Sequence, residues 1–127
     1  MSSSTPRESE TILQVVRGER PWTDLRTVGI DVRLEEDRCL YSNPKHIDAT
    51  ANIYDLATGF LAHLQDSRAL REWAFLLEAA DFGLEVEQHP AGPTILDAVW
   101  RASFGETVEK ETIRALHQLI EESRSHA

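Results

Sequence analysis

The sequence predicts a mainly α-helical α+β domain of four to six helices with one small β-hairpin near residues 30–41. Apolar residues recur at intervals of three and four over most of the chain, which is the period of an amphipathic helix. Residues 30–35 instead alternate apolar and polar side chains, which is the period of a half-buried strand. At 127 residues the chain is long enough for one domain with a core of its own.

The first two helices are marked by proline and glycine. The segment TPRE, residues 5–8, combines a capping box with a proline at the first helical position, and Gly18 ends the helix that it begins. A strand is the alternative for residues 9–17, because ILQVV is rich in β-branched side chains. A shorter helix is predicted over residues 21–28.

A long central helix is predicted after the hairpin. Asn43 is a good capping residue and Pro44 suits the first helical position, so we expect a helix over residues 44–65. Such a helix would be about 33 Å long. Apolar side chains cover most of its circumference, which indicates a position in the middle of the domain.

Three more helices complete the predicted fold. They span residues 66–81, 94–104 and 107–124, each with apolar residues at helical spacing. Trp73 and Trp100 lie within these patterns, and we expect both in the core.

The dipeptide Phe-Gly occurs at residues 82–83 and 104–105, within the similar sequences AADFGLEVE and RASFGETVE. In both places it follows an apolar helical pattern. Glycine accepts the left-handed conformation that ends a helix, and flanking apolar residues can close over such an end. The residues upstream of the two sequences do not match, so we predict two helix caps rather than a duplicated unit.

The chain is acidic, and the acidity is uneven. The net charge is −9, and residues 47–127 hold six Lys/Arg against fourteen Asp/Glu, a balance of −8. Such a surface repels phosphate backbones, so we expect no nucleic-acid partner. It can attract a basic protein partner. The alternative is that the charge only maintains solubility.

The expected location is the cytoplasm. The sequence has no apolar run near 18 residues and no apolar signal-peptide core, so we expect neither a membrane span nor secretion. The single cysteine, Cys39, excludes an internal disulfide, and we expect a buried, inert thiol. We predict disorder for residues 1–4 and a single globular domain over residues 5–124.

Common catalytic motifs are missing from the sequence. It contains no phosphate-binding glycine loop, no HExxH, no GxSxG and no EF-hand loop. We therefore expect no enzymatic activity, no cofactor and no metal ion.

One polar stripe on the predicted central helix is the candidate for an alternative function. At spacings of three and four the stripe comprises Asp48, Asn52, Asp55, Gly59, His63 and Asp66. It could line a polar groove of a small enzyme or metal-binding protein, with ligands added from another helix. Asp55 and His63 alone cannot share an ion, because eight residues separate them by about 12 Å. Gly59 would allow another backbone to come close.

Phe75 is the candidate for the centre of a protein interface. It lies on the same helical side as Arg71, Glu72 and Glu78, away from Trp73. An aromatic side chain among charged ones is typical of an interface residue with a polar surround. The alternative is that a neighbouring element covers Phe75.

These observations favour a non-catalytic, acidic protein-binding domain. One form of it is a bacterial immunity-like or antitoxin-like inhibitor that covers a basic surface of its partner. The alternatives are the enzyme or metal protein described above, and a structural subunit that forms a homodimer through Phe75.

Overall fold

The computed structural model of the chain describes residues 6–125. These residues form five α-helices, one 3-10 helix and four short strands, which confirms the predicted fold class. In chain order the elements are α1 (Pro6–Val16), η1 (Trp22–Val28), β1 (Asp31–Leu34), β2 (Cys39–Ser42), β3 (Thr50–Asn52), α2 (Ile53–His63), α3 (Ser67–Ala79), β4 (Gly83–Glu85), α4 (Gly92–Ser103) and α5 (Lys110–Ser125). The predicted cap at Thr5 and the predicted disorder of residues 1–4 lie outside the described residues.

The first segment is helical, as predicted, and not a strand. Ile12, Val15 and Val16 are buried on one side of α1. Gly18 and Gly29 follow α1 and η1 with φ of 78° and 87°, the left-handed conformation that glycine adopts easily. No helix among the described residues is long and apolar enough to cross a membrane.

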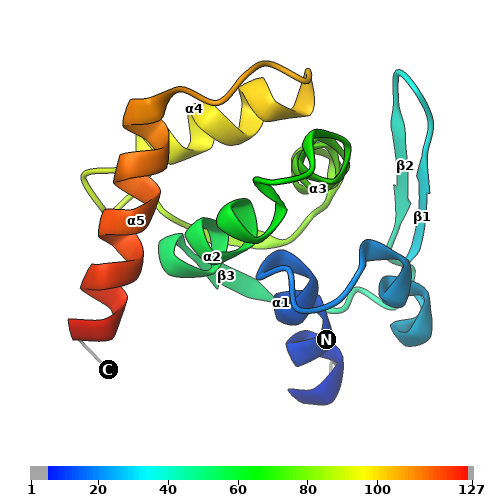
Figure 1. Cartoon of the computed structure of the whole chain (residues 1–127). Helices are drawn as coiled ribbons and strands as arrows, with labels where there is room; N and C mark the ends of the chain where they lie inside the picture. Colours follow the sequence, from blue (N-terminus) through cyan, green and yellow to red (C-terminus); the bar gives the residue numbers. More distant parts are fainter. Residues whose placement is uncertain (1–5, 126–127) are drawn as a thin grey trace.

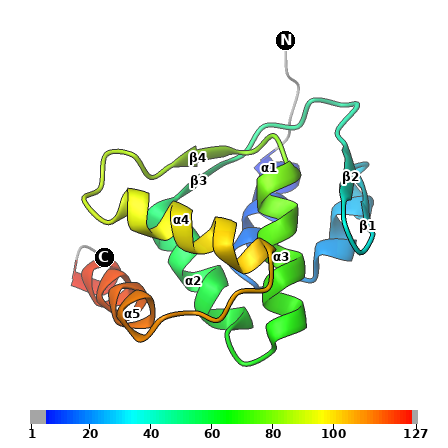
Figure 2. The same ribbon diagram turned by 90° about the horizontal axis from the view of Figure 1, so that it is seen from above.

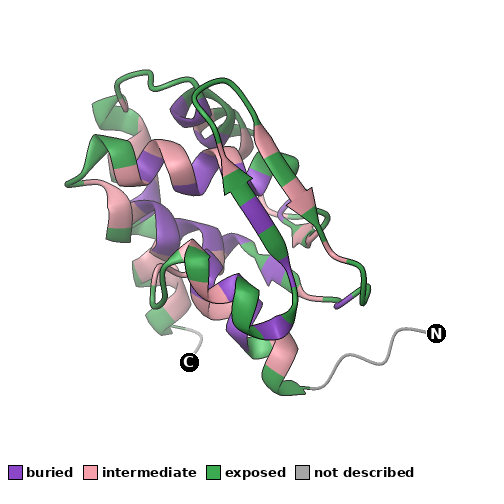
Figure 3. Ribbon diagram, turned by 90° about the vertical axis from the view of Figure 1, so that its right-hand side faces the viewer, coloured by how far each residue is buried: buried purple, intermediate pink, exposed green. Residues whose placement is uncertain are grey.

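The predicted hairpin is formed by β1 and β2, which pair antiparallel from Asp31 opposite Ser42 to Leu34 opposite Cys39. Burial alternates along β1 (Figure 3). Val32 is buried, and its neighbours Asp31 and Arg33 are exposed. The hairpin stands beside α3 (Figure 1). Leu40 is on the opposite face of the hairpin from Val32 and is 43% exposed.

The prediction of one helix over residues 44–65 is wrong, because α2 begins only at Ile53. The side chain of Asn43 instead closes a turn, accepting a hydrogen bond from the backbone N–H of Ile47 and donating one to its carbonyl. Residues 50–52 then pair in parallel with residues 83–85 as β3 and β4. This pairing buries Ala51 and satisfies backbone groups between segments far apart in sequence, which no local pattern reveals.

Gly59 of α2 lies where the backbone at the end of α1 comes close. This agrees with the expectation that a glycine inside a helix allows another backbone to approach. A Cβ atom at this position would be 1.8 Å from the carbonyl oxygen of Val16. The same oxygen accepts a hydrogen bond of 2.9 Å from the indole N–H of Trp73. Helices α1, α2 and α3 therefore meet at this point in the core.

Only one of the two predicted Phe-Gly caps is present. Gly105 has φ of 78° and follows α4, as predicted. The prediction for Gly83 is wrong: α3 already ends at Ala79, and Gly83 begins β4. Its N–H donates to the carbonyl of Ala49, so pairing with the segment before α2 determines its conformation.

The helices form two layers, with α4 lying across α2 and α3 (Figures 1 and 2). Helix α5 packs on α2 at one side, whereas the hairpin packs on α3 at the other. Helix α3 contributes side chains to two hydrophobic clusters. Trp73 and Leu77 pack toward α2 and α4, and Leu76 packs toward α1 and the hairpin. The remaining surface between α3 and α4 carries the candidate site.

Candidate functional site

Helices α3 and α4 and the tip of the hairpin line an open groove of about 440 Å³. Its apolar lining is aromatic: Phe75 comes from α3, and Trp100 and Phe104 come from α4 and its C-terminal end. Trp100 is 51% exposed and Phe104 is 64% exposed, while Phe75 is half-buried. We call this feature the aromatic groove.

The prediction that Trp100 belongs to the core is wrong. The positions of α4 that face the core are Ile95, Val99 and Ala102, at spacings of four and three. Trp100 lies on the adjacent side, where its ring meets that of Phe104 edge to face at 5.0 Å between centroids. The apolar residues of α4 thus form two faces: one is buried, and the other packs on the core at Leu96 but is exposed at Trp100 and Phe104.

The end of α4 holds Phe104 in this exposed position. The N–H of Gly105 donates to the carbonyl of Ala102, and the N–H of Glu106 donates to that of Arg101. This pair of hydrogen bonds with a left-handed glycine is the Schellman motif of helix ends. The expected closure of Phe104 over the cap does not occur, because the ring packs against Trp100 instead.

Arg71 joins the aromatic groove to the hairpin. Its guanidinium lies over the ring of Phe75, 5.9 Å from the centroid, and donates a hydrogen bond of 2.6 Å to the carbonyl of Glu36. The hairpin tip, residues 36 and 37, thereby becomes a wall of the groove. Phe75, Arg71 and Glu78, which helical spacing placed on one side of the helix, all line this groove. That they belong to a protein interface stays a prediction.

Glu72, the fourth residue of the predicted interface, lies elsewhere. It lines a separate hollow beside Trp22, His63 and Trp73, and its carboxylate is 3.5 Å from the guanidinium of Arg68. The helical spacing placed Glu72 near Phe75, but α3 turns it toward α1 and η1.

Carboxylates surround the aromatic groove. Glu36, Asp37 and Glu78 line it, and Arg71 is the only cationic residue among its described lining residues. Partial burial raises the pKa of the Glu78 carboxyl above its ordinary value. An ionised Glu78 would therefore gain from a cation placed beside it.

The structure does not assemble the polar stripe Asp48–Asp66 into one site. Asp48 lies in the loop before β3, and Asn52 and Asp55 form the capping box of α2. His63 is at the far end of α2, about 16 Å from Asn52, where it stacks on Trp73 and contacts the carbonyl of Gly59. Asp66 caps α3 by accepting from the N–H groups of residues 68 and 69. These contacts give Asn52, Asp55 and Asp66 structural roles.

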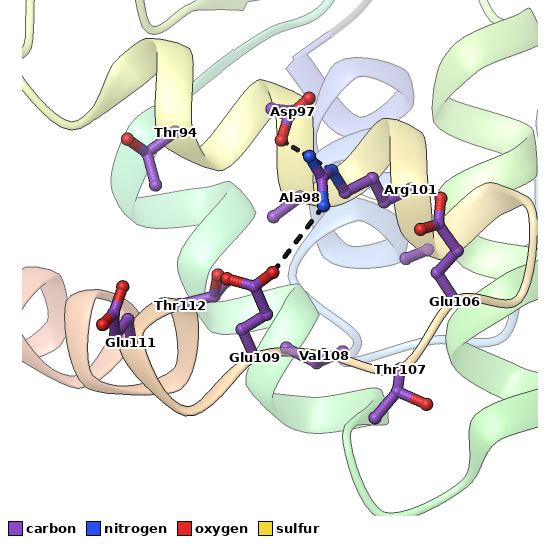
Figure 4. Close-up of a pocket in the computed structure, with 11 residues that line it drawn as sticks. Thr94, Asp97, Ala98, Arg101, Glu106, Thr107, Val108, Glu109, Glu111 and Thr112 are labelled. Atoms are coloured by element: carbon purple, nitrogen blue, oxygen red, sulfur yellow. Dashed lines mark ion pairs between the residues drawn. The ribbon is translucent and has the colours of Figure 1, made fainter.

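A second hollow, of about 170 Å³, lies between α4 and the start of α5 (Figure 4). Arg101 lies between Asp97 and Glu109, at 2.9 and 3.7 Å from their carboxylates. Its charge is thus already matched, and the other charged residues of this hollow are acidic. Within residues 6–125 no group of three or more His, Cys, Asp or Glu side chains is arranged to hold a metal ion.

Comparisons with protein-family models, with curated protein sequences and with solved structures gave no match. The interpretation of the aromatic groove therefore depends on the residues of this chain alone.

Trp100 and Phe104 are the residues that sequence reasoning missed. A signal was present in their spacing: Leu96, Trp100 and Phe104 recur every four residues, beside the buried series that begins at Ile95. Two apolar series on one helix indicate two contacted faces. The sequence did not reveal which series the rest of the chain covers.

Proposed function

We propose that this protein is a non-catalytic binding domain that docks a basic protein partner on the aromatic groove. The observation that carries the proposal is the exposure of Trp100 and Phe104, together with Phe75, in one groove. Large aromatic side chains grouped on a surface are typical of residues that dominate binding energy.

The charge of the chain supports the choice of a basic partner. The net charge is −9, and carboxylates surround the groove. Opposite potentials accelerate association and favour correctly charged partners. In this proposal the protein acts in the cytoplasm, as an immunity-like or antitoxin-like inhibitor of bacterial type that covers a basic surface of its target.

The proposal is tested by comparing binding of three forms of the protein. The full chain, a Trp100→Ala/Phe104→Ala variant and a Leu40→Ala variant would be used to isolate binding proteins from cells of the source organism. Leu40 is an exposed apolar residue on the outer face of the hairpin, outside the groove, so it is the matched control.

We expect one or more proteins to bind the wild type and the Leu40→Ala variant stoichiometrically. The same proteins should not bind the Trp100→Ala/Phe104→Ala variant. Equal melting temperatures of the three forms would show that folding is preserved. Binding that survives the double substitution, or is lost equally with Leu40→Ala, would contradict the proposal.

A further inference from the structure

The aromatic groove adjoins a second hollow of similar size, with which it shares two lining residues. That hollow, about 440 Å³, is lined by Leu56, Leu77, Leu84 and Leu96, and we call it the leucine hollow. Glu78 and Trp100 line both spaces and stand between them. A partner that covers Trp100 can therefore reach two apolar hollows at once.

The two hollows are about one helical turn apart along α4. Leu96 and Trp100 line the leucine hollow, and Trp100 and Phe104 line the aromatic groove. A displacement of four residues along a helix corresponds to about 6 Å. Side chains at positions i and i+4 of a second helix have nearly the same separation, about 5–6 Å between Cβ atoms.

The charges around the hollows favour a cationic occupant. Glu36, Asp37, Glu78 and Asp97 line the combined surface, and Arg71 is its only cation among the described lining residues. Asp97 is already paired with Arg101, so the attraction for a cation depends on Glu36, Asp37 and Glu78. Arg71 is already engaged with the carbonyl of Glu36 and the ring of Phe75. Glu78 lies at the junction of the hollows, where a cation between two apolar side chains would meet it.

A second copy of this chain is a poor occupant for the same reason. A twofold interface brings the same surface from both copies together. The acidic residues around the hollows would then face each other, and like charges in an interface are costly. The surface is complementary to a different, basic chain.

Resting on the proposed function, we infer that the partner contributes a basic amphipathic helix. Two of its apolar side chains, at positions i and i+4, enter the aromatic groove and the leucine hollow. A Lys or Arg on the same face, within one turn of this pair, lies against Glu78. Helices that dock into grooves through regularly spaced apolar side chains are a common mode of recognition.

The inference is tested by selection from a displayed library of randomised helical peptides. The intact protein is the target. Peptides that also bind the Trp100→Ala variant are discarded, because they bind outside the surface around Trp100. We expect the selected peptides to share an apolar pair at i and i+4 and to carry Lys or Arg on that face. Selected peptides that bind in an extended conformation, or that lack the apolar pair, would overturn the inference while leaving the proposed function in place. Selected acidic peptides would contradict both, because the proposed function requires a basic partner.

A selected peptide is then measured against variants of the protein. We expect Trp100→Ala to weaken its binding at least about 30-fold, as for a residue that dominates an interface. Glu78→Gln should weaken binding about threefold, and Leu40→Ala should not change it. If Glu78→Gln leaves the affinity unchanged, the inferred contact between Glu78 and a Lys or Arg of the partner helix is contradicted. If no peptide depends on Trp100, both the inference and the proposed function fail.

Discussion

At the scale of single residues, two tryptophans on neighbouring helices differ in environment. Trp73 is 3% exposed and donates to the carbonyl of Val16, whereas Trp100 is 51% exposed. Trp73→Ala should lower the free energy of unfolding by about 3–5 kcal/mol, as expected for emptying a core aromatic site. Trp100→Ala should change it by less than about 0.5 kcal/mol.

Urea denaturation of both variants measures this difference. Equal destabilisation would place Trp100 in the core and remove the main support for a binding surface on α4. This result would also contradict the division of α4 into one buried and one exposed apolar face.

Gly59 offers a sharper test of the core geometry. An added Cβ would be 1.8 Å from the carbonyl oxygen of Val16 and 2.8 Å from the ring of Trp73. Gly59→Ala should therefore destabilise the fold by at least about 1–3 kcal/mol, although alanine favours helices.

Gly83→Ala is the control for this substitution, because its nearest neighbour would be the movable hydroxyl of Thr50 at 3.0 Å. Thermal melting should show a clearly smaller loss for Gly83→Ala. A Gly59→Ala variant as stable as the wild type would mean that α1 does not approach α2 so closely.

Glu78 should make the stability of the fold depend on pH. Its pKa is raised in the folded state by burial, so folding favours the protonated carboxyl. The resulting stabilisation is complete below the ordinary glutamate pKa of 4.5 and is lost as pH rises through the raised pKa of the folded state.

Glu78→Gln removes this titration. Measured from pH 3.5 to 7, the stability of the wild type relative to Glu78→Gln should therefore fall as pH rises. A relative stability that rises over this interval would show that Glu78 has a favourable charged partner in the folded state.

At the scale of elements, α5 is attached to the rest of the fold by a polar cluster as well as by Leu116 and Leu119. Glu122 accepts hydrogen bonds of 2.8 Å from the hydroxyl of Tyr54 on α2 and from Nε2 of His89. Nδ1 of His89 accepts from the N–H of Ala91, so the ring proton is on Nε2.

Tyr54→Phe should increase hydrogen exchange of the amides of α5, because one of these contacts is lost. Tyr41→Phe is the matched control: it removes a hydrogen bond of 2.7 Å to Asp81, at the hairpin side of α3. Exchange in α5 that is unaffected by Tyr54→Phe, or affected equally by both variants, would argue against this attachment.

At the scale of the whole molecule, the net charge of −9 should increase the association rate of a basic partner. Long-range attraction is screened at distances beyond about 8 Å at physiological ionic strength. The association rate of a basic partner or selected peptide should therefore decrease as salt is raised, with a smaller change in its dissociation rate.

Stopped-flow measurements at low and high salt would determine both rates. The Leu40→Ala variant should show the same salt dependence as the wild type, because it leaves every charge in place. An association rate independent of salt would contradict an electrostatic role for the acidic surface.

The sequence by itself determined the elements whose signals are local. Glycines 18, 29 and 105 end helices where predicted, and alternation at residues 30–35 identified the first strand of the hairpin. The stripe through Trp73 also identified the buried side of α3. In each case the conformation depends on residues within a few positions, so the pattern in the sequence was sufficient.

The tertiary structure decided what depends on distant partners. Residues 50–52 are a strand because residues 83–85 pair with them, although Asn43-Pro44 locally favours a helix. Likewise, both apolar series of α4 are suited to a core, but only the series that begins at Ile95 is buried, and Leu96 is the one member of the other series that packs partly against the core. Trp100 and Phe104 are therefore left at the surface, because the rest of the chain packs against the other face of their helix.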